Sequence, residues 1–546
     1  MQALVHAGPH DCIRGGIHGS RCRPASADKG KKSPVSDKNK SRSVRRCFRS
    51  RFGTKLYPAY VANCPQWDCK KKRRQDRKLA FLPPHETLAA ITDDDNRDAF
   101  TSFSPEQRRF RQDLESWAAS MMVHLVGAWA CLALWGDMAP HTKTDSIFLL
   151  TWALMNGQCR QRFWLTCLSK SRVCKCGCKG RHSFNLIFSV VAWSVRALQA
   201  GTWPAFNHLG QRFRFGDWRR KMSGNPIGLC GTVLRKFGDW EWMKNGLGLR
   251  GWQGETSRKL ICMFCAASKL YDPWAYDPSL EAGWRSTITS EPEFWSQNVS
   301  SKSYVSPLWL IPGFRLEWVK ADWMHVFCLG ILPICVGNCV LPLWERLGGS
   351  RKTPVPACSL LHNLIALAAR DLGVPTPFRF LTLGMFSPKP RSKPRMRLKA
   401  AEARAFAPVL LHVMATFFPS SPEHTLRMQC LGALVSMYKE LDNWQPSGVS
   451  RHLVSVLIRR HITLFGMLRE MMPADSPRWC FVPKHHIAIH VAENADTCPR
   501  LEWNYRDESE IGVCALNARW VCQTVIEVQL VSRYSDGFEL EPFEQT

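Results

Sequence analysis

The chain has 546 residues, of which 74 are Lys or Arg and 45 are Asp or Glu, giving a formal net charge of +29 at pH 7. This length exceeds one ordinary domain, and the 45% share of hydrophobic residues is that of a globular protein. The excess of basic residues favours a polyanionic binding partner, with nucleic acid first and an acidic membrane surface second. The 23 cysteines and the absence of a signal-peptide pattern in MQALVHAGPH argue against a disulfide framework and favour a reducing compartment.

The first 80 residues hold much of the positive charge, with 21 Lys and Arg against 5 Asp and Glu. Ser, Gly and Pro are frequent and apolar periodicity is weak, so we expect a basic, largely disordered tail over residues 1–100. The cluster KKKRRQDRK, residues 70–78, is typical of nuclear-import and nucleic-acid-binding segments, and a merely solvated tail explains it equally well. We take the cluster to predict a nuclear protein.

A helical region with a cysteine-rich segment is predicted over residues 101–222. Residues 104–168 have a helical pattern, and FNLIFSVVAWSVRALQAG, residues 184–201, has helical length and ends at a glycine. Between them lie four potential zinc ligands in VCKCGCKGRH: Cys174, Cys176, Cys178 and His182. Their spacing is tighter than usual, and they reach one tetrahedral ion only if the chain folds back locally.

Two strands that end in acids are predicted in the first part of a sheet-containing core, residues 223–345. IGLCGTVLRKFGD, residues 227–239, ends at Asp239. FRLEWVKAD, residues 314–322, alternates apolar and polar side chains and ends at Asp322.

A helical insertion is predicted over residues 346–474, and the last part of the core over residues 475–546. Apolar residues recur at helical spacing from Leu361 to Leu372. Further helical stretches cover residues 401–418, 424–442 and 450–471. In the last part, RWCFVPKHHIAIHV has strand character, and DESEIGVCALNARWVCQ is a helix with Glu508 on its inward face. The whole pattern predicts a mixed α/β protein.

The run from Val326 to Trp344 has nineteen residues without a charge, which is close to the length of a membrane span. It contains Pro333 and Pro342, and Asp322 and His325 stand just before it. We therefore predict a buried core helix and no membrane.

Three carboxylates are placed where they could share metal ions. Asp239 and Asp322 end strands and Glu508 opens a helix, and three such acids can hold two divalent ions for phosphodiester chemistry. Mg²⁺ suits such a site because it prefers hard oxygen ligands. His325 follows Asp322 by three residues, where it could bond the carboxylate, bond a DNA phosphate, or satisfy the open start of a helix.

Cys262 and Cys265 have the spacing of half a zinc site. The chain offers two sources of further ligands: the histidines His485, His486 and His490, and the cysteine-rich segment at residues 173–182. Two buried core cysteines are an equally good interpretation of the pair.

Several of these motifs occur in an order that resembles a known family. GDWEWMKNGLGLRGW, CMFC, DWMHVFCLGIL, PKHHIAIH and YRDESEIG, within residues 170–525, resemble the transposases of CACTA (En/Spm)-type DNA transposons and their cut-and-paste relatives. The resemblance implies a ribonuclease H-like mixed-sheet core, interrupted by a large all-helical insertion before the final acid.

The same resemblance implies a DDE triad of Asp239, Asp322 and Glu508 with His325 as its associated histidine. It implies Mg²⁺ or Mn²⁺ at the triad and a structural Zn²⁺ at Cys262 and Cys265. The activity would be DNA strand cleavage and transfer, with transposon ends and target DNA as partners and a homo-oligomer as the working form.

Alternatives remain at this stage. Asp507 or Glu510 could replace Glu508 as the third acid, because both lie beside it. The chain could be a decayed or domesticated transposon-derived protein that binds DNA or chromatin without cleaving, a membrane protein anchored through residues 326–344, or a nuclease without transposition.

Overall fold

A four-stranded mixed sheet lies at the centre of the computed structural model. The model describes residues 56–538 except 239, 250–259, 269–273, 301–304, 388, 390, 446–447 and 522–524. The strands are β3 (Trp129–Pro140), β4 (Ser146–Leu154), β5 (Phe163–Ser169) and β6 (Cys230–Gly238). Their order is β5-β4-β3-β6, in which β3 pairs antiparallel with β4 and parallel with β6, and β4 pairs antiparallel with β5. The protein is therefore a mixed α/β protein, as predicted.

Three of these strands lie where the sequence predicted helix. Residues 104–168 form one helix, α4 (Arg108–Met121), followed by β3, β4 and most of β5. Nearly every residue of these strands is buried, because both faces of the sheet are covered, and such strands lose the alternation that identifies a half-exposed strand. The sheet therefore begins well before residue 223, where we had placed the start of the core.

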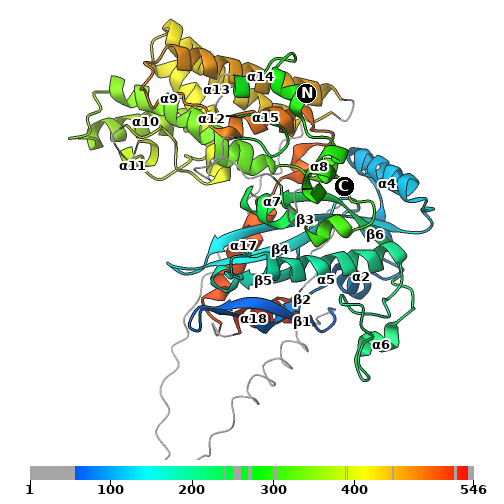
Figure 1. The fold of residues 1–546 in the computed structure, drawn as a ribbon. Helices are drawn as coiled ribbons and strands as arrows, with labels where there is room; N and C mark the ends of the chain where they lie inside the picture. The colour runs from blue at the N-terminus through cyan, green and yellow to red at the C-terminus, as the bar shows by residue number, and fades with distance from the viewer. Residues whose placement is uncertain are drawn as a thin grey trace, which may run out of the picture. The chain divides into compact units, whose positions relative to one another are not determined.

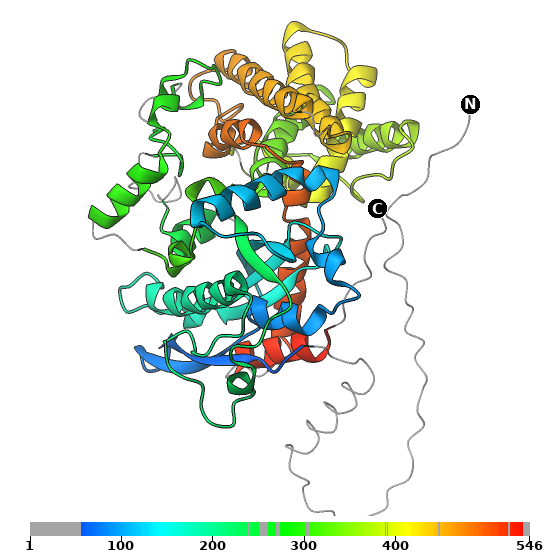
Figure 2. The same ribbon diagram turned by 90° about the vertical axis from the view of Figure 1, so that its right-hand side faces the viewer.

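Helices cover the two faces of the sheet (Figures 1 and 2). Phe148 of β4 packs edge-on against Phe184 of α5 (Arg181–Ala200), with ring centroids 5.6 Å apart. Thr151, which points to the opposite face because strand side chains alternate, bonds α17 (Tyr505–Ala518). The prediction of helix over residues 184–201 is confirmed, and the strand predicted over residues 227–239 is present as Cys230–Gly238.

A long hairpin precedes the sheet, and it corrects the predicted disorder for residues 56–100. Strands β1 (Tyr60–Asp68) and β2 (Arg73–Phe81) pair antiparallel along their whole length. Two short helices follow, α2 (Pro84–Ile91) and α3 (Arg97–Thr101). The basic residues that suggested disorder are exposed around the hairpin turn, while alternate residues of β1 and the end of β2 are buried. Residues 1–55 lie outside the described part of the chain.

The prediction of helices over residues 346–474 is confirmed. The helices are α10 (Val355–Asp371), α11 (Leu383–Phe386), α12 (Ala400–Phe417), α13 (Pro422–Asp442) and α14 (Val449–Glu470). Together with α9 (Leu332–Arg346) they gather at the top of Figure 1, beyond one edge of the sheet.

The apolar run expected near residues 326–344 forms a π-helical segment, Met324–Ile331, that continues into α9. Among the described residues, this is the single helix that is long and apolar enough to cross a membrane. Its most apolar window is 94% buried inside the protein, as in the core helix of a soluble domain.

Two further strand predictions are wrong. Residues 314–322 contain a single 3-10 turn, Leu316–Trp318, after which Val319 forms one parallel bridge with Lys236 of β6. RWCFVPKHHIAIHV contains the helix α15 (Pro483–Glu493), in which Pro483 occupies the first turn, where a missing N–H has no consequence. The last part of the chain is thus helical where it is described. The remaining helices are α6 (Trp218–Met222), α7 (Trp240–Leu247), α8 (Glu291–Ser300), α16 (Pro499–Glu502) and α18 (Ile526–Asp536).

Candidate active site and metal-ligand clusters

Asp322 lies at the start of the apolar helical segment and bonds its first N–H groups. Oδ1 accepts from the backbone N–H of Met324 (3.1 Å), and Oδ2 accepts from that of His325 (3.0 Å). These N–H groups have no partner within the helix, and a negative charge there also meets the positive end of the helix dipole. This explains why a fully buried acid stands at the mouth of an apolar run.

The imidazole of His325 is held among three carboxylates. Its Nδ1 lies 2.5 Å from Oδ2 of Asp322, and its Nε2 lies 3.3 Å from Oε1 of Glu508 and 3.8 Å from Oδ2 of Asp137. Burial by itself lowers the pKa of His325, but the hydrogen bond to Asp322 and the charges of all three acids outweigh burial and raise the pKa to about 9. His325 is therefore a cation at neutral pH. We call Asp137, Asp322, His325 and Glu508 the acidic cluster.

Three elements that are distant in the sequence bring the acidic cluster together. Asp137 lies near the end of β3, and Glu508 lies in the first turn of α17. Tyr505, at the start of α17, donates a hydrogen bond to the sulfur of Cys328 in the π-helical segment (3.0 Å). This contact holds the two helical elements against each other next to the sheet.

The structure separates the three alternatives for the third acid. Asp507 is buried and accepts hydrogen bonds from Oγ1 of Thr151 (3.0 Å) and from Nε of Arg162 (2.8 Å). Glu510 accepts a hydrogen bond from the indole N–H of Trp164 (2.6 Å). Both acids thus bond the sheet, and only Glu508 of the three reaches His325.

Asp137 is a member that sequence analysis missed, because its strand was predicted to be helical. Asp239, predicted as the first acid, lies outside the described residues. Gly238, which precedes it, pairs in register with Gly136, and Phe237 pairs with Trp135. In the sequence, an aromatic residue, glycine and aspartate thus occur in the same order at residues 135–137 and 237–239. That repetition is the signal that could have identified Asp137.

The two paired glycines have a packing reason. A Cβ atom on Gly136 would lie 2.8 Å from the ring of Trp242, and one on Gly238 would lie 2.1 Å from it. Gly238 also has a φ of +152°, which side chains rarely adopt. Trp242 of α7 therefore packs against β3 at Gly136 and against the end of β6 at Gly238.

A second cluster joins Cys262 and Cys265 to two histidines of α15. Each of Cys262, Cys265, His486 and His490 offers one ligand atom, all four atoms lie within 4.8 Å of one another, and all four residues are buried. The sulfur of Cys265 lies 3.1 Å from Nε2 of His486, which lies 3.0 Å from Nε2 of His490. His486 and His490 are one helical turn apart and so point the same way. Sequence analysis named both histidines, but it could not choose between them and the other sources.

The surroundings of this cysteine–histidine cluster orient its possible ligand atoms toward one another. Nδ1 of His486 bonds the carbonyl oxygen of Ala275 (2.5 Å), which leaves Nε2 with its lone pair toward the cysteines. Hydrogen bonds from Cys262 and from the two histidines, opposed by burial, lower the pKa of Cys265 to about 2. His485 points elsewhere: its ring packs on Phe465, with centroids 4.4 Å apart.

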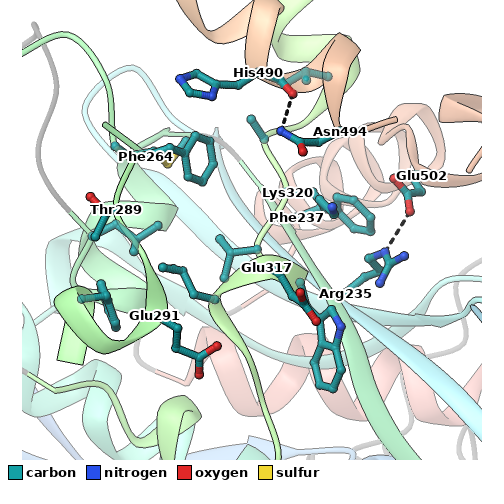
Figure 3. A pocket seen from close by; sticks show the side chains of 18 of the residues that line it. Arg235, Phe237, Phe264, Thr289, Glu291, Glu317, Lys320, His490, Asn494 and Glu502 are labelled. Carbon is teal, nitrogen blue, oxygen red and sulfur yellow. Dashed lines mark hydrogen bonds and ion pairs between the residues drawn. The ribbon is translucent and has the colours of Figure 1, made fainter. Parts of the chain in front are cut away.

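A cavity of about 740 Å³ lies beside the cysteine–histidine cluster (Figure 3). Phe264 and His490 form part of its lining, together with the buried guanidinium of Arg235. Arg235 donates to Glu502 (2.9 Å) and to Asp113 (2.6 Å), so its charge is balanced within the protein. The four residues of the acidic cluster do not line this cavity, so it is a separate feature.

Comparisons with protein families and with curated proteins found no relative. No protein-family model matches the chain, and no curated protein has a significant match to it.

Proposed function

We propose that the protein is a transposase-like enzyme that cleaves and transfers DNA strands with the help of Mg²⁺ or Mn²⁺ at the acidic cluster. The observation that carries the proposal is the convergence of Asp137, Asp322, His325 and Glu508 from a strand end, a helix start and a second helix start. The net charge of +29 fits a DNA partner. A nuclear location and action as a homo-oligomer belong to the same proposal.

The order of the secondary structure supports a ribonuclease H-like core. Such a core has three consecutive antiparallel strands, then a helix, then a strand parallel to the first. The elements β3, β4, β5, α5 and β6 follow this order, and Val319 adds an extended residue beyond β6. The helices over residues 346–474 then correspond to the insertion before the final acid.

The donors of the acidic cluster fit a divalent ion. Asp137 and Glu508 offer carboxylate oxygens, and His325 offers Nε2 once the ion displaces its proton; these atoms all lie within 4.8 Å of one another. Asp322 fixes the orientation of His325 through Nδ1, as carboxylates do for metal-bound histidines. When bound, a divalent ion would activate water or a 3′-hydroxyl for in-line attack on a phosphodiester and stabilise the leaving oxygen. Asp239, which follows Gly238 in the sequence, stays a predicted further ligand.

A structural Zn²⁺ at Cys262, Cys265, His486 and His490 belongs to the same proposal. Two thiolates and two imidazoles are a common tetrahedral ligand set for zinc, and four protein ligands leave no open position on the ion for a substrate. The metal would join the loop that carries Cys262 and Cys265, which precedes the helices of residues 346–474, to α15, which follows them.

One observation favours a second function, a transposon-derived protein that binds DNA without cleaving it. The cationic His325 lies among Asp322, Asp137 and Glu508, so it partly neutralises the acidic cluster with no metal bound. A cluster balanced in this way can persist as a structural network after cleavage activity is lost.

The test is cleavage of supercoiled plasmid and of short DNA duplexes in Mg²⁺ or Mn²⁺. We expect Asp137→Asn, Asp322→Asn and Glu508→Gln each to lower the rate by at least about a hundredfold, because each removes a charge at the reacting centre. DNA binding, measured separately, should stay within a few-fold of wild type.

Glu115→Gln is the matched control, because Glu115 is an exposed acid that pairs with Arg111 on the surface of α4. It should cleave like the wild type. A folded wild-type protein that binds DNA and does not cleave with either metal overturns the enzymatic proposal and leaves the DNA-binding protein.

A further inference from the structure

A third group of potential metal ligands lies in the loop after β5 and the first turn of α5. It consists of Cys174, Cys176, Cys178 and His182, whose ligand atoms all lie within 4.8 Å of one another. Nδ1 of His182 lies 3.2 Å from the sulfur of Cys176 and 3.6 Å from that of Cys174, and these two sulfurs are 3.4 Å apart. We call these four residues the turn cluster.

These distances are close to the edges of a zinc tetrahedron. With Zn–S near 2.3 Å and Zn–N near 2.0 to 2.1 Å, ligand atoms on a tetrahedron are about 3.5 to 3.8 Å apart. The observed separations are a few tenths of an ångström shorter or equal, so small side-chain rotations are enough to admit the ion.

The backbone of the turn is folded back in a way that gathers the ligands. Gly177 and Gly180 have φ values of +91° and +85°, and Lys179 has a φ of +53°. The N–H of Gly180 donates to the carbonyl of Cys174 (3.1 Å), which closes the loop around the three cysteines. The local folding that the tight spacing requires is therefore present.

The tautomer of His182 suits metal binding. A guanidinium N–H of Arg74 lies 3.4 Å from Nδ1 of His182, and arginine can only donate, so Nδ1 carries a lone pair, which a metal ion bound there would take over from Arg74. Three thiolates and a neutral imidazole around Zn²⁺ would have a net charge of −1. Arg74 stands beside that charge and offsets it.

From this geometry we propose that the turn cluster binds a second, structural Zn²⁺ through three thiolates and Nδ1 of His182. The ion would join the start of α5 to the loop before it, next to the β1–β2 hairpin: Arg74 is in β2, and the hydroxyl of Ser183 donates to the carbonyl of Pro65 in β1 (2.5 Å). Residues 70–74 at the hairpin tip are basic and exposed, so the metal would lie close to a basic surface. This inference does not depend on the proposed catalysis.

The test is the zinc content of the purified full chain, measured by elemental analysis and by native mass spectrometry. We expect two equivalents in the wild type and one in the double variant Cys176→Ser/Cys178→Ser. These two cysteines are exposed and half-buried, so the variant should fold. With Co²⁺ in place of zinc, the same variant should lose part of the thiolate-to-metal absorption.

Cys69→Ser is the matched control. Cys69 is an exposed cysteine of the β1–β2 hairpin, its thiol donates to the carbonyl oxygen of Ser171, and it is not a member of the turn cluster. It should keep both equivalents. Cys262→Ser tests the cysteine–histidine cluster. If Cys262→Ser loses one equivalent of zinc and Cys176→Ser/Cys178→Ser loses none, this inference is overturned. A loss in the double variant alone supports it and contradicts zinc at the cysteine–histidine cluster.

Discussion

His85 shows how burial controls a single titratable residue. It is fully buried in α2, where its Nδ1 bonds the hydroxyl of Ser194 (2.8 Å). Burial, aided by the charge of Arg219, lowers its pKa to about 3. Because the folded pKa lies below the unfolded value, the unfolded chain takes up a proton first as the pH falls. His85 thus destabilises the fold progressively below about pH 6.5.

We therefore expect His85→Asn to weaken the loss of stability in acid. The free energy of unfolding of the wild type should fall between pH 7 and pH 5 by about 2 kcal/mol more than that of the variant. Denaturant titrations at both pH values measure the difference. The exposed His124 is the control, since His124→Asn should keep the wild-type pH dependence. Equal losses in wild type and His85→Asn would contradict the assignment.

At the scale of elements, α7 packs closely on two strands of the sheet, at Gly136 of β3 and Gly238 of β6. The ring of Trp242 occupies the space that side chains at Gly136 and Gly238 would need. The acid-bearing end of β3 is therefore supported by a contact that tolerates no extra carbon atom.

Gly136→Ala tests this contact. We expect a loss of about 1 to 3 kcal/mol in the free energy of unfolding, the usual cost of overpacking. Gly512→Ala in α17 is the matched control: its Cβ meets nothing within 4 Å, so it should stabilise by about 0.5 to 1 kcal/mol. Thermal or denaturant unfolding measures the change in the free energy of unfolding for both variants. If Gly136→Ala leaves the free energy of unfolding unchanged, Trp242 moves aside easily.

At the scale of the whole molecule, the cysteine–histidine cluster brings together segments from either side of the helices over residues 346–474. Cys262 and Cys265 precede residues 346–474, and His486 and His490 follow them. A metal there binds the folded protein and not the separated segments of the unfolded chain, so it should stabilise the fold.

We expect a strong chelator to lower the melting temperature by several degrees. The measurement is made in Cys176→Ser/Cys178→Ser, so that the turn cluster does not contribute. Adding Cys262→Ser should abolish the effect of the chelator, whereas adding Cys480→Ser, at a half-buried cysteine outside the cluster, should not. A melting temperature that the chelator leaves unchanged would contradict a structural metal there.

The amino-acid sequence by itself determined the features that depend on near neighbours. Helical periodicity predicted α10, α12, α13 and α14, and the acid before an apolar run marked a helix start at Asp322. Such signals are local, because helix spacing and capping involve residues within a few positions of each other. Fully buried strands such as β4 have no alternation, so the same local reasoning predicted helix there.

Only the tertiary structure decided which residues meet. The parallel pairing of β3 with β6 places the strand that carries Asp137 beside the strand that precedes Asp239 in the sequence. The docking of α17 brings Glu508 to His325, while Asp507 bonds Arg162. The packing of α15 selects His486 and His490 as partners of Cys262 and Cys265. These choices depend on strand register and helix docking between segments hundreds of residues apart, which no local pattern in the sequence records.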